Sequence, residues 1–274
     1  MEVRANAKIN LGLNVTGIRQ DGYHNIETVF YPIRSVYDRL VVECNGSDDI
    51  ELREEGDWVI AGEKERNLIV RVFRLFQTRY DIGGVNVLCE KNIPYGAGLG
   101  GGSADAAFTA LALNRLFELR LTSQQLQQLV APLGADCAFF ILNTPCFAEG
   151  VGDILSTIDL SLSGYQILLV KPADAVSTQE AYNKVNVQIP AISLRELVKQ
   201  PVAQWRNSVV NDFEVSVFPQ HPAIAAIKEK MYDMGALYAS LSGSGSTVYG
   251  LFPKTNNLPD MRPVFPDCWV SLER

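Results

Sequence analysis

Apolar and polar residues alternate through the first part of the chain, which is the period-two pattern of half-buried β-strands. Strands are predicted over 8–15, 27–33 and 39–44, with a turn at 19–24 and a polar stretch over 45–57. The segment LIVRVFRLFQTRY then carries its apolar residues at helical spacing, and Asn67 directly before it is a suitable N-cap. The chain therefore opens with β structure and continues into a helix.

Strand-like and helical patterns follow one another through the remainder of the chain. A strand is predicted over 85–91, a helix over 103–118, a second helix that begins with a capping box at Thr122 and Gln125, and a hairpin over 147–155. The second half contains helices predicted over 177–185, 193–200 and 222–235, and strands over 165–170, 237–243, 246–252 and 269–273. This order predicts an α+β fold, with domains over 1–158 and 159–274 and an antiparallel sheet in the second.

The segment PYGAGLGGGSADAA (94–107) lies between a predicted strand and a predicted helix and carries the strongest chemical signal. Its five glycines are free to adopt backbone angles closed to other residues, so successive amide groups can face one anion at a helix N-terminus. The alternative is a mobile surface loop, but such loops rarely continue without a break into a segment that forms a helix as readily as 103–118. The segment therefore predicts a phosphate-binding loop in a nucleotide-binding enzyme.

Two known glycine-loop templates fit this segment poorly. GAGLGG matches the dinucleotide-binding fingerprint, but that fingerprint also needs an acidic residue about 20 positions on, after a second strand, and Glu118 ends a helix instead. A Walker-type loop ends in Gly-Lys-Ser/Thr, whereas Ser-Ala-Asp follows these glycines. A dehydrogenase and a P-loop NTPase are therefore disfavoured.

Two charged residues lie where an ordinary fold does not require them. Lys8 is on the same face of its strand as Asn6 and Asn10, so it is either a solvated edge-strand lysine or a lysine that stabilises phosphate charge. Asp136, in LGADCAFF, is either a helix N-cap or a carboxylate that orients or deprotonates an attacking hydroxyl.

Two turns offer further binding groups. In the turn DGYH, Tyr23 presents a stacking face and His24 a hydrogen-bonding edge, which suit a nucleobase, although Asp-Gly alone suffices for a hairpin turn. The segment LSGSGST (241–247) is either a plain hairpin or a second glycine loop whose backbone meets substrate or phosphate.

Composition narrows the class of protein. The net charge of −7 and the pI near 5.0 argue against a nucleic-acid partner. No apolar run reaches the roughly 18 residues that span a membrane, and the N-terminus lacks a signal-peptide pattern, so a cytoplasmic protein without membrane attachment is expected. Five widely spaced cysteines and two histidines predict neither a disulfide framework nor a zinc site.

Six ordered segments together resemble the GHMP kinases, and they span nearly the whole chain. They are AKINLGLNVTGIRQDGYHNIET (7–28), RNLIV (66–70), KNIPYGAGLGGGSADAA (91–107), LGADCAFF (133–140), FAEGVGD (147–153) and LSGSGSTVYG (241–250). The DGYH turn near an AKIN strand resembles the corresponding segment of one group of these kinases. Members of that group use ATP to phosphorylate the 2-hydroxyl of a cytidine diphosphate-linked methylerythritol, on the non-mevalonate route to isoprenoid precursors. The resemblance implies that small-molecule substrate, with Mg²⁺ accompanying ATP.

The resemblance also implies a role for individual residues. Lys8 and Asp136 match the catalytic pair, with Asp136 as base or orienting group and Lys8 as its charge partner. Residues implied on the ATP side are Asn67, Lys91, Pro94, Gly96, Ala97, Gly98, Leu99, Gly100, Gly101, Gly102 and Ser103, with Asn67 and Lys91 near the adenine. Residues implied on the substrate side are Asn10, Tyr23, His24, Thr178, Tyr182, Gly243, Ser244 and Gly245, with Tyr23 and Tyr182 on the two faces of cytosine.

The implied fold is an N-terminal domain like ribosomal protein S5 domain 2 followed by a ferredoxin-like C-terminal domain. Asn6 stands where the family commonly has proline, and Cys137-Ala138 stands where it usually has Val-Pro, so the turn that aims Asp136 differs from the family pattern. The alternatives are a GHMP kinase that acts on another small alcohol and, in a different class, a non-catalytic nucleotide-binding protein. A monomer or weak homodimer is expected.

Overall fold

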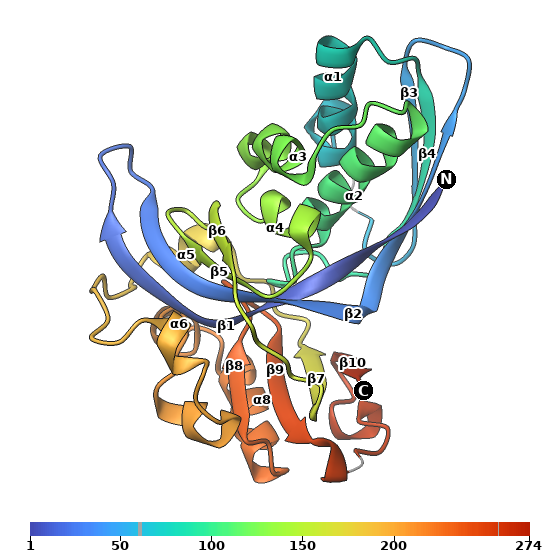
Figure 1. Ribbon diagram of the computed structural model, residues 1–274. Coiled ribbons are helices and arrows are strands. Elements are labelled where there is room, and N and C mark those ends of the chain that lie inside the picture. The colour runs from blue at the N-terminus through green and yellow to red at the C-terminus, as the bar shows by residue number, and fades with distance from the viewer. Residues whose placement is uncertain (60–61, 257) are drawn as a thin grey trace. The chain divides into compact units, whose positions relative to one another are not determined.

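The computed structural model describes residues 1–59, 62–256 and 258–274, and these form two compact units. Unit 1 comprises 1–7, 36–95 and 100–144, and unit 2 comprises 8–35, 96–99 and 145–274. The long strands β1 (Glu2–Ile18) and β2 (His24–Cys44) contribute residues to both units (Figure 1). Each unit is assembled from separate stretches of the chain. A single boundary between residues 158 and 159, as predicted from the sequence, is therefore not tested by this division.

Unit 1 contains a sheet that includes the second half of β2, β3 (Ile50–Glu55) and β4 (Val85–Glu90). β2 pairs antiparallel with β4, and β3 runs parallel to β4. The two strands predicted over 27–33 and 39–44 are parts of the one strand β2. β3 lies in the polar stretch where no strand was predicted, because Ile50 is the only fully buried residue of its six and the apolar alternation is weak.

Four helices of unit 1 are α1 (Leu68–Tyr80), α2 (Gly101–Leu116), α3 (Ser123–Val130) and α4 (Cys137–Leu142). In Figure 1, α1 and α2 lie against one face of the β3–β4 sheet. The predicted N-cap is confirmed, because the side-chain oxygen of Asn67 accepts from the Ile69 amide at 2.9 Å. The capping box of Thr122 and Gln125 is confirmed as well. These caps fix where α1 and α3 begin.

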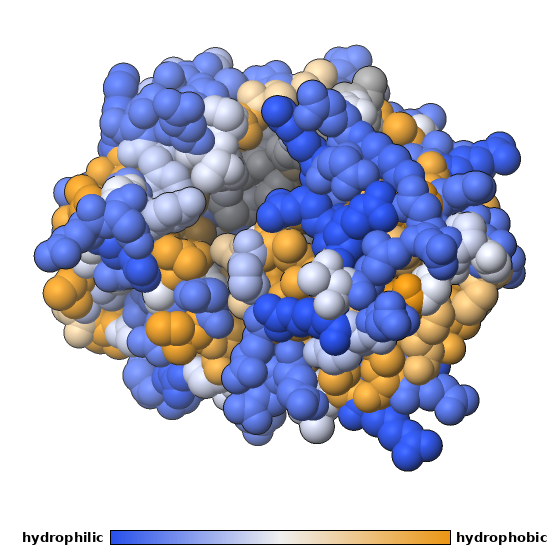
Figure 2. Space-filling model, turned by 90° about the horizontal axis from the view of Figure 1, so that it is seen from above, coloured by the Kyte–Doolittle hydropathy of each residue, from blue (hydrophilic) through white to orange (hydrophobic). Residues whose placement is uncertain are grey.

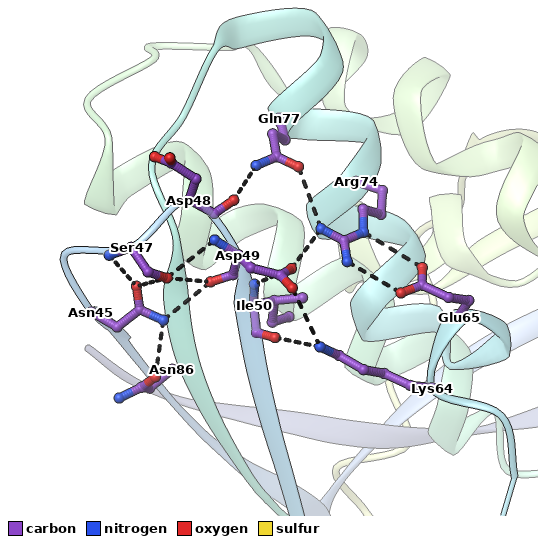
Figure 3. A network of polar contacts seen from close by, with 10 residues as sticks. All are labelled: Asn45, Ser47, Asp48, Asp49, Ile50, Lys64, Glu65, Arg74, Gln77 and Asn86. Atoms are coloured by element: carbon purple, nitrogen blue, oxygen red, sulfur yellow. Dashed lines mark hydrogen bonds and ion pairs between the residues drawn. The ribbon is translucent and has the colours of Figure 1, made fainter.

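A surface network joins the β2–β3 turn to α1 (Figure 3). The Asp49 carboxylate pairs with the Arg74 guanidinium at 2.6 Å, and Arg74 also pairs with Glu65 at 3.2 Å. The Asn45 side chain contacts both Ser47 and the end of the turn. These side chains are substantially exposed, so each pair contributes at most about 1 kcal/mol, and the network orients α1 more than it stabilises it.

Unit 2 contains an antiparallel sheet in the order β10 (Trp269–Glu273), β7 (Tyr165–Lys171), β9 (Val248–Pro253) and β8 (Tyr238–Leu241). Helix α8 (Pro222–Asp233) packs on β8 and β9, as Figure 1 shows. Their shared core includes Leu168, Val170, Ile224, Met231, Leu241, Val248 and Phe252. The predicted antiparallel sheet and helix are therefore confirmed, and the α+β class with them.

The remaining elements of unit 2 are short. β5 (Cys146–Glu149) and β6 (Ile154–Thr157) form the predicted hairpin, and residues 28–30 of β2 pair with β5. The short helices are α5 (Thr178–Tyr182), α6 (Leu194–Leu197) and α7 (Glu214–Val217), with the 3₁₀ turn η3 (Val202–Asn207). They lie in connections between the longer elements and place polar side chains near β1 and β8.

Figure 2 shows one face on which hydrophilic residues predominate, with hydrophobic residues in small groups among them. None of the described helices is long and apolar enough to cross a membrane. All five cysteines are free thiols.

Candidate functional site

Lys8 is buried in β1 and belongs to a chain of polar contacts inside unit 2. Its side chain is on the face predicted from the alternation, where Nζ donates to Asn10 Oδ1 at 2.6 Å. The Asn10 amide donates in turn to Thr28 Oγ1 at 3.0 Å, and that hydroxyl donates to the Gly12 carbonyl at 2.6 Å. With only 3% of its surface exposed, Lys8 is not a solvated edge-strand lysine. A buried ammonium held in this way is suited to meeting an anion.

The first part of the glycine loop, residues 96–99, packs on the second glycine loop within unit 2. The Lys8 amide donates to the Leu99 carbonyl at 3.0 Å, the Thr247 amide donates to Ala97 at 3.2 Å, and the Ser242 hydroxyl donates to Gly98 at 2.9 Å. A Cβ at Gly98 would collide with the Ser242 carbonyl oxygen, and φ is +73° there. Only glycine therefore allows these two loops to meet as they do.

The second glycine loop brings backbone to the side of Lys8. A Cβ at Gly243 would lie 3.2 Å from Asn10 Oδ1 and 3.6 Å from Lys8 Nζ, and φ at Gly243 is +55°. The predicted residues Ser244 and Gly245 follow in the same loop, and Gly245 also has positive φ. The segment is therefore more than a plain hairpin, because its backbone lines the position of the Lys8 ammonium.

The second part of the first glycine loop, residues 100–103, begins α2 in unit 1. Gly100 is the N-cap in the left-handed region with φ +75°, and the Ala104 amide donates to its carbonyl at 2.8 Å. Gly96 and Gly98 also have positive φ, so the loop alternates backbone conformations in the manner of anion-binding nests. Ser103 lies in the first turn of a 16-residue helix, whose N-terminal dipole favours an anion.

Asp136 occupies the N-cap position of α4, but its carboxylate makes no capping hydrogen bond. The N-cap explanation therefore does not account for an aspartate here. A Cβ at Gly134 in the same turn would lie 3.2 Å from Cys137 Sγ and 3.4 Å from Ser103 Oγ, so the turn packs directly on the start of α2. Burial raises the pKa of the Cys137 thiol to about 11, which keeps it neutral at this position.

Lys91 lies in a buried ion triad of unit 1. Its ammonium bonds to the carboxylates of Asp38 and Asp105, and its side chain is 11% exposed. Asp38 also accepts from the Asn92 and Ile93 amides, at 2.5 and 2.8 Å, where the chain enters the glycine loop and the buried Pro94 follows. The triad therefore holds the backbone in place where it enters the glycine loop.

The charged groups of the triad shift one another's pKa values. Burial raises the pKa of the Asp105 carboxyl, and the neighbouring Asp38 carboxylate adds to the rise against the opposing effect of Lys91. Burial alone would lower the pKa of Lys91, but Asp105 and Asp38 outweigh it and hold that pKa above its usual range. The Asp105 Oδ1 atom is buried with no hydrogen-bond partner among the described residues.

The aromatic residues predicted on the substrate side come together in unit 2. The His24 and Tyr182 rings stack with centroids 4.4 Å apart, and Tyr182 meets Phe213 edge-on at 4.7 Å. Tyr23, the residue before His24, is 66% exposed. The Phe213 ring therefore supports the stacked rings of His24 and Tyr182, while the neighbouring Tyr23 is exposed to solvent.

Helix α5 holds Tyr182 and the exposed Thr178 through contacts at its start. Ser177 is the N-cap and accepts from the Glu180 amide at 3.1 Å. The His221 ring contacts Glu180 at 2.8 Å and Asp174 at 3.2 Å. Burial lowers the pKa of His221, but the two carboxylates outweigh it and raise the pKa above its usual value. The His221 ring therefore links Asp174 to α5, the helix that carries Tyr182.

Metal ligands are sparse. Among the residues that the structure describes, no three His, Cys, Asp or Glu side chains gather as a metal site. The carboxylates of Asp38 and Asp105, where the chain enters the glycine loop, already hold Lys91. A resident Mg²⁺ cage therefore does not fit these side chains, and a hard cation would have to arrive on phosphate oxygens.

Several structural residues were not predicted from the sequence. They are Asp38 and Asp105 of the triad and the polar residues Asn211, Asp212 and Glu214 of the segment VNDFE (210–214). The available signal was a charged residue inside an apolar stretch, since Asp38 lies in a strand and Asp105 in an Ala-rich helix. Such residues are seldom fully buried unless they are paired.

The chain matches the family model of the GHMP kinases N terminal domain over residues 67–144 and that of the GHMP kinases C terminal over 193–262. The 4-diphosphocytidyl-2-C-methyl-D-erythritol kinase of Bacteroides thetaiotaomicron is 51% identical over 257 residues, and that of Bacteroides fragilis 49% over 256, each covering 93% of both chains. A crystal structure of 4-(cytidine 5'-diphospho)-2C-methyl-D-erythritol kinase matches with a TM-score of 0.82 and 32% identity, over 99% of this chain and 98% of the other.

Proposed function

Because this chain belongs to the GHMP kinases and is a small-molecule kinase with their α+β fold, we propose that its substrate is 4-diphosphocytidyl-2-C-methyl-D-erythritol. It transfers a phosphoryl group from ATP to the 2-hydroxyl of that alcohol, in the supply of isoprenoid precursors. The observation that carries the proposal is the buried Lys8 ammonium, held by Asn10 beside the Gly243 backbone. A GHMP kinase that acts on another small alcohol is the alternative.

On the ATP side, the glycine loop from Gly96 to Ser103 binds the phosphates with its amide groups and the N-terminus of α2. Asn67 and Lys91 lie near the adenine in this proposal, and Pro94 belongs to the same ATP site. Mg²⁺ would accompany ATP and would neutralise phosphate charge. Lys91 stays in the proposed ATP site, where its contacts with Asp38 and Asp105 make support of the loop its main effect.

In the proposed reaction, Asp136 accepts or orients the proton of the 2-hydroxyl as that oxygen attacks the γ-phosphorus. The new P–O bond forms while the bond to the β–γ bridging oxygen breaks, and ADP leaves with the electron pair. Lys8 stabilises the negative charge on the transferring group, and Asn10 fixes the ammonium for that task. The reaction thus rests on positioning and electrostatics, as phosphoryl transfer does generally.

On the substrate side, the cytosine ring lies against Tyr182 and Tyr23, and His24 bonds to its edge. The support is the stack of His24 on Tyr182, together with the edge-on Phe213 behind it. Thr178 and the loop 243–245 complete the pocket. The two-domain division over 1–158 and 159–274, the monomeric or weakly dimeric state and the cytoplasmic location also stay predictions.

The direct test supplies the purified chain with Mg-ATP and 4-diphosphocytidyl-2-C-methyl-D-erythritol, and follows ADP release together with the new phosphate signal by ³¹P NMR. Mevalonate and homoserine serve as comparison alcohols. Turnover of the cytidine compound alone is expected. Tight ATP binding with turnover of a different alcohol would contradict the assigned substrate and leave the kinase family intact, and no transfer to any alcohol would favour a non-catalytic nucleotide-binding protein.

Replacing Tyr182 with alanine is expected to raise the KM for the cytidine-bearing substrate about tenfold or more, because stacking on an aromatic ring contributes about 1–3 kcal/mol per base. The KM for ATP should change little. Tyr182→Phe is the matched control, since it keeps the ring that stacks on His24. An unchanged KM in Tyr182→Ala, and likewise in Tyr23→Ala, would rule out the cytosine assignment.

A further inference from the structure

The segment VNDFE (210–214) of unit 2 is bound along β1 by its backbone. The Leu13 amide donates to the Val210 carbonyl at 2.9 Å, and the Asp212 amide donates to Leu13 at 2.8 Å, which makes a short parallel bridge. The Asp212 carboxylate accepts from the Val15 amide at 2.7 Å and from the Asn14 side chain at 3.3 Å. The segment is thereby fixed to the strand that carries Lys8.

Asn211 connects this segment to the second glycine loop. Its side-chain amide donates to the Leu241 carbonyl at 2.8 Å and to the Gly243 carbonyl at 2.9 Å, and its Oδ1 accepts from the Phe213 amide at 3.0 Å. The residue is 2% exposed. Since the C=O and N–H of a trans peptide point in opposite directions, the Gly243–Ser244 peptide directs its N–H away from Asn211.

Glu214 binds the same loop from a second direction. Its Oε1 accepts from the Leu241 amide at 2.9 Å and from the Ser240 hydroxyl at 3.1 Å, and its Oε2 pairs with Lys228 at 2.5 Å. Asn211 and Glu214 therefore bind both the amide and the carbonyl of Leu241. The segment 210–214 thus holds the second glycine loop where it leaves β8. Because the same segment is bound to β1, it also holds Lys8 in place relative to that loop.

We propose that Asn211 and Glu214 are positioning residues for phosphoryl transfer, which hold the Gly243 backbone at the Lys8 ammonium. This inference rests on the proposed kinase function. A Cβ on Gly243 would be 3.6 Å from Lys8 Nζ, so the backbone lies close to the ammonium. A small shift of the loop therefore changes the surroundings of the Lys8 ammonium. A misplacement of about 1 Å can cost a hundredfold in rate.

The test compares Asn211→Leu, which keeps the size and removes both donors, with Gln166→Leu. Gln166 is a 4% exposed amide of the same unit that donates to the Lys254 carbonyl at 3.4 Å, at the other end of β9. Asn211→Leu is expected to lower kcat per folded molecule at least tenfold, with each KM within about threefold. Gln166→Leu is expected to keep the kcat of the wild type. An equal kcat for the two variants would overturn the proposal.

Hydrogen exchange in the protein without substrate separates this inference from the proposed function. Asn211→Leu should speed amide exchange across 241–247, while Gln166→Leu should not. Unchanged exchange in that segment would overturn the positioning role whatever the substrate is. If Asn211→Leu does not fold, Glu214→Gln takes its place, with a smaller loss of kcat and faster exchange expected, and no effect on either would overturn the proposal.

Discussion

Replacing Asp136 with asparagine is expected to lower kcat by about two to four orders of magnitude, because an amide of the same shape cannot accept the proton of the attacking hydroxyl. The Asp136 side chain makes no capping hydrogen bond, so this change removes no cap from α4. The measurement is the rate of ADP release with both substrates saturating. The Kd for ATP, measured on the same preparation, should match that of the wild type, and a thermal melt checks that the variant is folded.

The control for this variant is Asp81→Asn, in the same unit. Asp81 ends α1 in the left-handed region with φ +51°, a conformation that asparagine adopts readily, so this change should alter neither kcat nor folding. A loss smaller than about threefold in Asp136→Asn would show that the residue neither accepts nor orients the proton. The proposed mechanism would then lack its base, while the Lys8 and loop contacts would still stand.

Local patterns predicted those parts of the site whose residues are neighbours along one element. Period-two alternation placed Lys8 and Asn10 on one face of β1, and the hydrogen bond between them confirms it. The need for glycine at Gly98 was recognised as conformational freedom, but its partner, the Ser242 carbonyl, is 144 positions away. No periodicity encodes such a contact, since it depends on how β8 and β1 are placed in three dimensions.

The buried triad shows why some pairings could not be predicted. Arg39 lies opposite Glu90 in the β2–β4 register, and one step further along each strand come Asp38 and Lys91. That register is fixed by the buried faces of both strands, so a polar pair 53 positions apart in sequence follows from tertiary pairing alone. The prediction that Lys91 lies near the adenine came from family resemblance, which carries no information on this register.

Replacing Lys91 with methionine is expected to lower the free energy of unfolding by about 3–5 kcal/mol, because the buried Asp38 and Asp105 carboxyl groups then lose their cation. The transition temperature should fall by roughly 10 °C. The compensated control is Lys91→Met together with Asp38→Asn and Asp105→Asn, which leaves no buried charge and should recover much of the loss. If Lys91→Met and the compensated variant were equally unstable, packing rather than charge would be responsible.

The triad also predicts how stability depends on pH. The pKa of Asp105 is raised in the folded protein above its unfolded value of 3.8, so between the two values the folded state holds a proton that the unfolded chain has lost. The free energy of unfolding therefore falls as pH rises through that window. Asp105→Asn should flatten this slope relative to the wild type in denaturant titrations from pH 4 upward. An unchanged slope would mean that Lys91 keeps Asp105 ionised, and that the triad carries one net negative charge beside the glycine loop.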